Sequence, residues 1–108
     1  MKLYRLEKIA ELLRNEISLI IQRKIYDPRI KFVSIQNVEL TKDMKLARVH
    51  ISAFGDLESQ QKTFEALNNA KGFIKVELAR RVLLRFLPDI EFLLEESEPI
   101  ETIQDDLE

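Results

Sequence analysis

The first 25 residues place the strongest constraint on the fold, because they carry apolar side chains at helical spacing. The stripe repeats every three or four residues and consists of Leu6, Ile9, Ala10, Leu13, Ile17, Ile20 and Ile21. Charged side chains, among them Glu7, Glu11 and Arg14, occupy the other side and are spaced to pair across one turn. We predict a long amphipathic helix over residues 3–25, which needs a second layer to cover its apolar face.

The pattern then changes to the two-residue period of β-strands. Proline at position 28 ends the helix, since it cannot continue one. Residues 32–40 are rich in β-branched side chains but alternate imperfectly, whereas residues 46–54 alternate cleanly. In that second strand, Ala47, Val49, Ile51 and Ala53 face one way, and Arg48, His50 and Ser52 face the other. A short polar loop joins the two strands, which predicts an antiparallel hairpin.

Two further helices and a third strand complete the expected chain. We predict helices over residues 57–69 and 73–87, with Asp56 or Ser59 capping the first, and a strand over residues 90–94. In the first of these helices we place Leu57, Phe64 and Leu67 inward and Gln60 outward. In the second we place Val76, Ala79, Leu83 and Phe86 inward, with Leu78 and Val82 widening the stripe. The order αββααβ predicts a two-layer α+β domain with helices on one face of a three-stranded sheet.

Composition narrows the class of protein. A chain of 108 residues without cysteine forms one domain that has no disulfide and no thiolate metal site. Its single histidine, His50, lies on the polar side of a strand without a catalytic constellation around it. We therefore expect no metal, no cofactor and no enzyme, although a small enzyme that pairs His50 with Glu91 or Glu95 stays as a weak alternative. No apolar run approaches the roughly 18–20 residues of a membrane span, so we expect a soluble cytoplasmic protein.

Charge is unevenly distributed along the chain. All 17 lysines and arginines lie within residues 1–88, which hold 10 acidic residues and carry a net charge of +7. From Asp89 onward there are 9 acidic residues and no basic ones. We expect a basic domain over residues 1–97 and an acidic, flexible tail over residues 98–108. A basic body fits a polyanionic partner, and the tail could compete for the same surface.

The segment Ala70-Lys71-Gly72 is the candidate site. A bend here leaves the first amide N–H groups of the next helix without acceptors, which suits a phosphate beside Lys71 and Lys75. Taken alone, Gly72 is better explained as an ordinary helix C-cap, and it is the rest of the sequence that favours a site here. Further basic side chains follow on the helix at Arg80, Arg81 and Arg85, and others lie in the proline loop at Arg29 and Lys31. Aromatic residues are few, and we expect most of them in the core, which favours recognition of an RNA backbone over base stacking.

Several strings in this order resemble the ribosome-binding factor A family, whose domain is of the type II KH class. The family replaces the usual GxxG loop with a shorter bend, as Ala70-Lys71-Gly72 does here. The other matching strings are Asp27-Pro28-Arg29, Val38-Glu39-Leu40-Thr41-Lys42-Asp43, Lys45-Leu46-Ala47-Arg48-Val49-His50-Ile51 and Arg85-Phe86-Leu87-Pro88-Asp89-Ile90-Glu91-Phe92. The chain departs from the family at Lys8, where arginine is commoner, and at Glu96-Ser97, where Asp-x-Ser is commoner.

The resemblance implies a non-enzymatic assembly factor. It implies binding to the immature small (30S) ribosomal subunit and its 16S ribosomal RNA, with a part in late RNA processing and maturation. It also implies a monomer, a link to growth in the cold, and a GTPase that promotes release. The implied RNA-contacting residues are Ala70, Lys71, Gly72, Lys75, Arg80, Arg81 and Arg85, with Arg5, Lys8, Arg29 and Lys31 in second rank. The alternative is an adaptor whose basic face binds an acidic protein, with the tail as an inhibitor.

Overall fold

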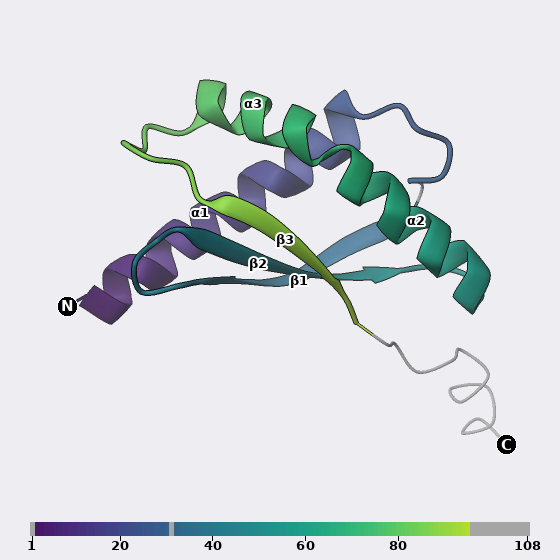
Figure 1. The fold of residues 1–108 in the computed structure, drawn as a ribbon, viewed down its shortest axis with the longest axis horizontal. Helices are drawn as coiled ribbons and strands as arrows, with labels where there is room; N and C mark the ends of the chain where they lie inside the picture. Colours follow the sequence, from purple (N-terminus) through teal and green to yellow (C-terminus); the bar gives the residue numbers. More distant parts are fainter. Residues whose placement is uncertain (1, 31, 96–108) are drawn as a thin grey trace, which may run out of the picture.

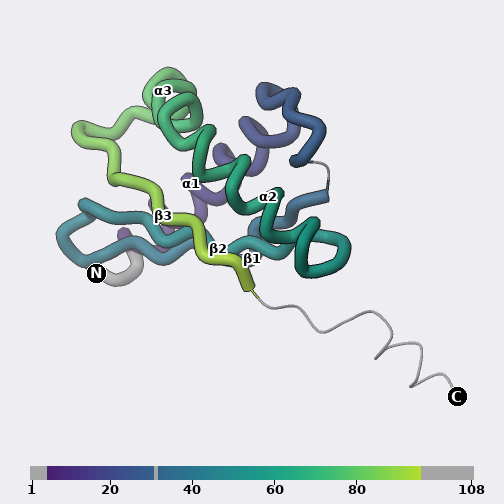
Figure 2. The backbone as a smooth tube through the Cα atoms, turned by 45° about the vertical axis from the view of Figure 1, so that its right-hand side comes forward, coloured from purple at the N-terminus to yellow at the C-terminus, as the bar shows by residue number. Residues whose placement is uncertain are grey.

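The computed structural model describes residues 2–30 and 32–95, which form three helices and three strands (Figure 1). In chain order they are α1 (Lys2–Lys24), β1 (Val33–Leu40), β2 (Leu46–Ala53), α2 (Leu57–Asn69), α3 (Lys71–Arg81) and β3 (Asp89–Leu94). All three helices lie on one side of the sheet, as both ribbon and tube show (Figures 1 and 2). The predicted α+β class and the αββααβ order are confirmed. The predicted tail over residues 98–108 lies outside the described residues, so the domain division stays a prediction.

The sheet has the order β1-β2-β3, and its pairings explain where the helices lie. β1 and β2 form the predicted antiparallel hairpin, whereas β3 lies parallel to β2. A parallel neighbour needs a crossover connection, because the chain must return to the same end of the sheet. Here α2 and α3 make that crossover, which brings the α2–α3 junction over the covered face of the sheet.

The core forms where α1 crosses the sheet. Leu13, Ile17 and Ile20 on α1 are fully buried, as the stripe predicted. They belong to one apolar cluster with Val49 and Ile51 of β2. Burying a side chain of this size stabilises the fold by about 1.5–3 kcal/mol, so the α1 stripe and the alternating strand hold the two layers together.

A β-bulge explains the imperfect alternation of β1. Ile35 pairs with Ile51 of β2 and Asn37 pairs with the adjacent residue, His50. Gln36 is therefore an extra residue in β1 that has no partner on β2. The buried side chains are therefore Ile35 and Val38, three positions apart instead of two. The Gln36 amide donates hydrogen bonds to Ser34 Oγ (3.3 Å) and Ser52 Oγ (2.9 Å) on the uncovered face of the sheet.

α2 begins as predicted but presents a different face to the core. Asp56 is the N-cap, and its carboxylate accepts the Ser59 N–H at 2.8 Å. Leu57 is 79% exposed, so its inward placement was wrong, as was the outward placement of Gln60, which is buried. The Gln60 amide donates to the Gly55 carbonyl at 2.7 Å, which satisfies its polar group inside. Leu57 points outward because it starts the helix, one turn before the residues that reach the sheet.

α3 is shorter than predicted and uses another apolar stripe. The helix ends at Arg81, because Val82 adopts an extended conformation (φ −119°, ψ 144°) and turns its side chain into the core. Ile74 and Leu78 are the other buried side chains. The predicted stripe was right at Leu78 and Val82, which are buried. It was wrong at its four main members, Val76, Ala79, Leu83 and Phe86, which are all exposed. A helix can turn only one stripe toward the sheet, and residues 83 and 86 lie beyond its end.

Candidate nucleic-acid interface

The bend between α2 and α3 lies at Ala70, the first residue of the predicted segment. Its backbone (φ −91°, ψ 1°) ends α2, and its N–H donates to the Ala66 and Leu67 carbonyls at 3.1 and 3.0 Å. Its carbonyl accepts the N–H of Ile74 at 2.9 Å, the first hydrogen bond of α3. Ala70 therefore serves both as the C-cap of one helix and as the N-cap of the next.

Gly72 lies inside the first turn of α3, so it is neither the bend that we predicted nor the helix C-cap of the alternative interpretation. Its φ is not positive, and a β-carbon added there would meet nothing within 4 Å. Neither backbone conformation nor packing within the described chain requires glycine here. As at the start of any α-helix, the first backbone N–H groups, here those of Lys71, Gly72 and Phe73, have no acceptor within α3, and no side chain caps the helix. The positive end of the α3 dipole is thus open to an anionic ligand.

Lys75 is held at this end of α3 by the start of β3. Its Nζ lies 2.6 Å from Asp89 Oδ1. The hydrogen bond from Lys75, followed by its charge and that of Lys71, holds the pKa of Asp89 below its usual value. Lys71 is half-buried and makes no ion pair with any described residue. One carboxylate therefore faces two lysines, and the local charge stays positive.

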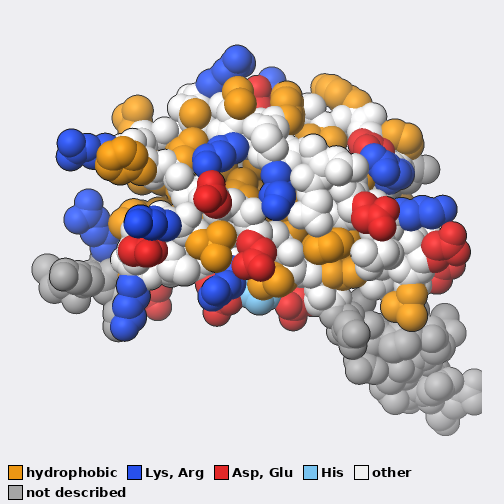
Figure 3. Space-filling view, viewed as in Figure 1, with side chains coloured by type: hydrophobic (Ala, Val, Ile, Leu, Met, Phe, Trp, Pro, Cys, Tyr) orange, Lys and Arg blue, Asp and Glu red, His pale blue; other side chains and the backbone are white. Residues whose placement is uncertain are grey.

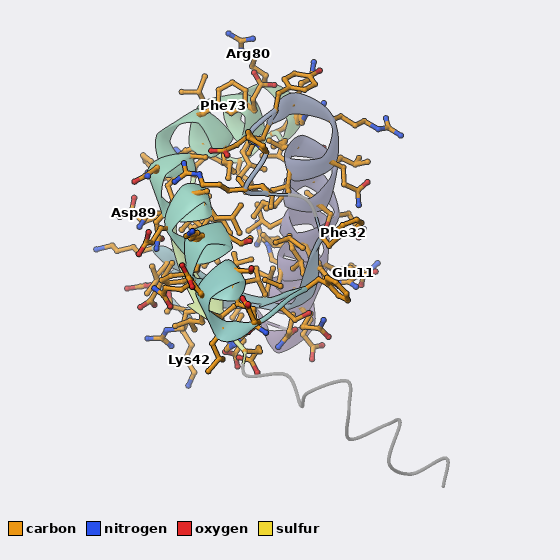
Figure 4. All side chains as sticks on the ribbon, turned by 90° about the vertical axis from the view of Figure 1, so that its right-hand side faces the viewer. Glu11, Phe32, Lys42, Phe73, Arg80 and Asp89 are labelled. Carbon is orange, nitrogen blue, oxygen red and sulfur yellow. The ribbon has the colours of Figure 1, made fainter. Side chains whose placement is uncertain are left out.

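The arginines that follow differ in how firmly they are held. Arg80 Nη1 lies 3.6 Å from Glu77 on the same helix, and Arg81 Nη1 lies 3.3 Å from Glu16 on α1. Arg85 belongs to the loop after α3, where its guanidinium stacks 5.8 Å from the centre of the Phe86 ring. Arg80 projects from the top of the molecule, away from the sheet (Figure 4). Over α3, basic side chains alternate with apolar ones on the same surface (Figure 3).

The second-rank candidates do not join this surface as one group. Arg29 binds its neighbour Asp27 through Nε (3.1 Å) and Nη2 (2.8 Å), which lowers the pKa of the carboxyl. Its carbonyl accepts the Thr63 hydroxyl at 2.8 Å, so the proline loop is fastened to α2. Arg5 lies eleven residues before Glu16, the contact of α1 with Arg81, and is therefore about 16 Å away along the helix axis. Lys8 shares this first part of α1, and Lys31 lies outside the described residues.

Exposed aromatic side chains are the feature that the sequence interpretation missed. Phe73 is 44% exposed and Phe86 76% exposed, beside the basic side chains of α3 and its following loop. Phe32 and Phe54 are also exposed and stack edge to face, with ring centres 5.8 Å apart. The expectation that most aromatics are in the core was wrong. The signal for Phe73 was the neighbouring pair Ile74 and Leu78, whose burial turns Phe73 outward.

His50 lies on the uncovered face of the sheet between two carboxylates. Its Nε2 is 2.7 Å from Glu39 Oε1 on β1, and its Nδ1 is 2.7 Å from Glu95 Oε2 just after β3. Both hydrogen bonds raise the pKa of His50, Glu95 having the larger effect, because an imidazolium can donate to both partners. Glu91 pairs instead with Arg48 at 3.4 Å. The contacts tie the three strands together across the sheet.

Residues 2–30 and 32–95 meet the requirements of neither a metal site nor a membrane-spanning helix. No group of three or more histidine, cysteine, aspartate or glutamate side chains in those ranges could hold a metal ion. None of the helices described there combines the length and hydrophobicity that a membrane crossing needs.

Comparisons with known proteins agree on one family. A family model described as "Ribosome-binding factor A" matches residues 5–105. The protein of that name from Desulfatibacillum aliphaticivorans is 43% identical over 93 residues, which cover 86% of this chain and 76% of the relative. Its counterpart from Caldanaerobacter subterraneus is 44% identical over 95 residues, covering 87% and 78% of the two chains.

Solved structures carry the same name. The crystal structure of ribosome-binding factor A from Thermus thermophilus matches with a TM-score of 0.74 and 32% identity, covering 85% of this chain and 97% of that one. A homology model of the Thermus thermophilus factor, fitted into a cryo-EM map of its complex with the 30S subunit, matches with a TM-score of 0.66 and 33% identity. That match covers 78% of this chain and 88% of the other.

Proposed function

The chain belongs to the ribosome-binding factor A family, and on that premise we propose that it binds the immature small (30S) ribosomal subunit through its 16S ribosomal RNA. We propose a non-enzymatic role in late RNA processing and subunit maturation. The 30S complex of the Thermus thermophilus relative supports the choice of partner. The same premise supports a cytoplasmic monomer that leaves the subunit with the help of a GTPase.

The first turn of α3 is the observation that carries the RNA-binding proposal. Three backbone N–H groups there have no acceptor within α3 and no side-chain cap, and Lys71 and Lys75 stand beside them. Such a helix end attracts phosphate through its dipole and its free donors together. The open space at Gly72 lets an RNA backbone approach closer than a side chain would allow.

Arg80, Arg81 and Arg85 extend this surface along α3 and its loop. Arg80 and Arg81 are paired within the protein, but the Arg80 side chain is 72% exposed and lies 3.6 Å from Glu77, a contact worth at most about 1 kcal/mol. Arg80 can therefore turn to a phosphate at little cost, whereas Arg81 must leave a more buried pair with Glu16. The exposed rings of Phe73 and Phe86 add surfaces on which a base can stack. Backbone contacts at the helix end, supported by stacking, are the proposed mode of recognition.

Binding to 30S particles across a salt series tests this proposal. Phosphate contacts release counterions, so the logarithm of the binding constant should fall linearly with the logarithm of the salt concentration. The double variant Lys71→Glu/Arg81→Glu should bind more weakly and with a shallower slope. The matched control is Lys62→Glu/Arg48→Glu, which makes the same charge change on α2 and on the uncovered face of the sheet. Binding that ignores salt, or equal losses in both variants, would sink the proposal.

The alternative function is an adaptor that uses the same face to bind an acidic protein. The exposure of Val76 (54%) and Leu83 (103%) is the observation that favours it, because aliphatic side chains gain nothing from phosphate. The two functions differ in their dependence on RNA. Capture of 30S components that survives ribonuclease treatment supports the adaptor, whereas loss of capture supports RNA binding.

A further inference from the structure

β1 is an edge strand, and its outer backbone groups are unpaired. The sheet order leaves β1 with β2 as its single neighbour. Hydrogen bonds from Phe54 N to the Phe32 carbonyl and from Thr41 N to the Leu46 carbonyl, each 3.0 Å, fix the phase of the ladder at its two ends. Phe32 and Thr41 thus face β2, and successive residues of a strand direct their backbone groups to opposite edges in turn. The residues that direct N–H and C=O away from β2 are therefore Val33, Ile35, Val38 and Leu40. None of these outward groups has a backbone partner in the described chain.

A groove between α1 and β1 lies in front of this edge. One hollow of about 740 Å³ follows residues 36–40, and a second of about 240 Å³ follows residues 33–35. Arg14 of α1 lines both, so they adjoin end to end. The groove therefore runs along all eight residues of β1, with α1 as its other wall.

We propose that this groove binds an extended segment of a partner protein, which adds to β1 as a fourth strand. A row of alternating N–H and C=O groups is matched by another peptide backbone, and a helix opposite the edge supplies pockets for alternate side chains. The apolar residues in the wall are Leu6, which is partly exposed, and Ala10 and Ile21, which are only 8% and 6% exposed. The segment should therefore carry apolar residues at every second position.

Charge in the groove favours a segment that is basic at one end. Glu7 and Glu11 line the larger hollow and make no ion pair with any described residue. Glu39 lines the larger hollow as well. Two basic residues, Arg14 and Lys42, also line it. The carboxylates repel a phosphate backbone, which disfavours RNA as the occupant. A lysine or arginine of the segment would lie beside Glu7 and Glu11.

The bulge and the position of the groove narrow the occupant further. The bulge bends this edge, and a short flexible segment can follow the bend more easily than a second folded copy of the domain, whose own β1 carries the same bulge. Glu11 lies on the opposite side of the molecule from Asp89, the partner of Lys75 (Figure 4). The partner protein and the RNA proposed above therefore occupy separate surfaces and can bind together.

Nuclear magnetic resonance with a synthetic peptide tests the proposal. The probe is a blocked peptide of about eight residues, the length of β1, in which valine alternates with threonine and lysine stands near one end. Titrated into the full chain, it should shift and protect the amides of Val33, Ile35, Val38 and Leu40. Two control peptides carry N-methyl groups on alternate amides in opposite phase. The peptide whose methyl groups replace the N–H groups that face β1 cannot form the ladder and should bind at least about tenfold more weakly. The peptide that is methylated on the other amides should bind like the probe.

Two variants complete the test. Glu11→Lys should weaken the probe several-fold, whereas Glu65→Lys, the same change on an exposed position of α2, should not. Val33→Pro removes an outward N–H at the first position of the strand, where proline is tolerated, and should also weaken binding. Failure of the probe to bind, equal binding by both methylated peptides, or the same amide shifts caused by polyuridine RNA would overturn the proposal.

Discussion

Lys75 Nζ lies 2.6 Å from Asp89 Oδ1, so α3 is tied near its start to the residue that begins β3. Both side chains are exposed, and the pair joins the proposed RNA-binding helix to the sheet. The hydrogen bond from Lys75 and the charges of Lys75 and Lys71 all act on the Asp89 carboxylate and lower its pKa, so this acidic residue lies among the lysines of the proposed site. Its carboxylate therefore opposes the field that would attract a phosphate.

Removing that carboxylate should strengthen RNA binding. We expect Asp89→Asn to bind 30S particles more tightly, with a salt slope steeper by about 0.7–0.9 if Lys75 gains one phosphate contact. The measurement is co-sedimentation at several salt concentrations. Glu91→Gln makes the same charge change on the uncovered face and should leave the slope unchanged. Equal effects of the two variants would mean that overall charge, and not the Lys75 site, determines binding.

Gly72→Ala should raise stability and lower binding. Alanine is favoured over glycine within a helix by up to about 1 kcal/mol, and its β-carbon meets no atom within 4 Å. The same β-carbon would stand between the open N–H groups and an RNA backbone. Thermal unfolding and 30S binding measure the two effects.

Gly55→Ala is the matched control for stability. Gly55 has φ of +113°, and a β-carbon there would lie 3.0 Å from Ser59 Cβ, so this variant should be destabilised. A Gly72→Ala protein that binds as well as the wild type would contradict a close backbone approach at this position.

The contact between Arg81 and Glu16 should contribute measurably to stability, because it joins α3 to α1 and both side chains are mostly buried (29% and 22% exposed). A double-mutant cycle with Arg81→Ala and Glu16→Ala should give a coupling of about 0.5–1 kcal/mol in urea unfolding. The exposed pair Lys62–Glu58 on α2 is the comparison and should give about 0.3 kcal/mol. A cycle without coupling would show that the α1–α3 ion pair is dispensable.

Stability should fall as His50 loses its proton. Its folded pKa is raised above the usual 6.5 by Glu95 and Glu39. The contribution is therefore complete below pH 6.5 and is lost as pH rises through the folded pKa. Proton titration of the imidazole resonances measures that pKa directly. His50→Asn should flatten this part of the stability profile, and Glu95→Gln should lower the pKa; an unshifted titration would contradict the bridging arrangement.

The order of helices and strands along the chain could be predicted because apolar residues recur at a different spacing in each type of element. The α1 stripe and the clean alternation of β2 needed no knowledge of their partners. β1 was harder to interpret, because Gln36 forms a bulge that depends on pairing with β2. α3 was misjudged for a similar reason. Its two apolar stripes are equally helical, and the contact of Ile74 with the core, which tertiary packing determines, selects between them.

The candidate site was predictable in its residues but not in its geometry. The segment Ala70–Gly72 marks the junction, yet the bend itself falls on Ala70, and Gly72 is helical. Nothing in the local sequence says that Arg81 reaches Glu16, 65 positions earlier in the chain. The exposure of Phe86 likewise follows from where α3 ends, and that of Phe73 from the burial of Ile74 and Leu78. The assignment of individual residues to RNA contact stays a prediction.

Site-specific crosslinking to 30S particles tests the central claim most directly. A photoreactive benzoylphenylalanine placed at Ala79, on the exposed face of α3, should crosslink to 16S ribosomal RNA. The control is the same group at Lys42, in the turn between β1 and β2 at the opposite end of the molecule (Figure 4). We expect strong RNA crosslinks from position 79 and few from position 42. Crosslinks from position 42 alone, or from 79 to protein but not to RNA, would contradict RNA binding through α3.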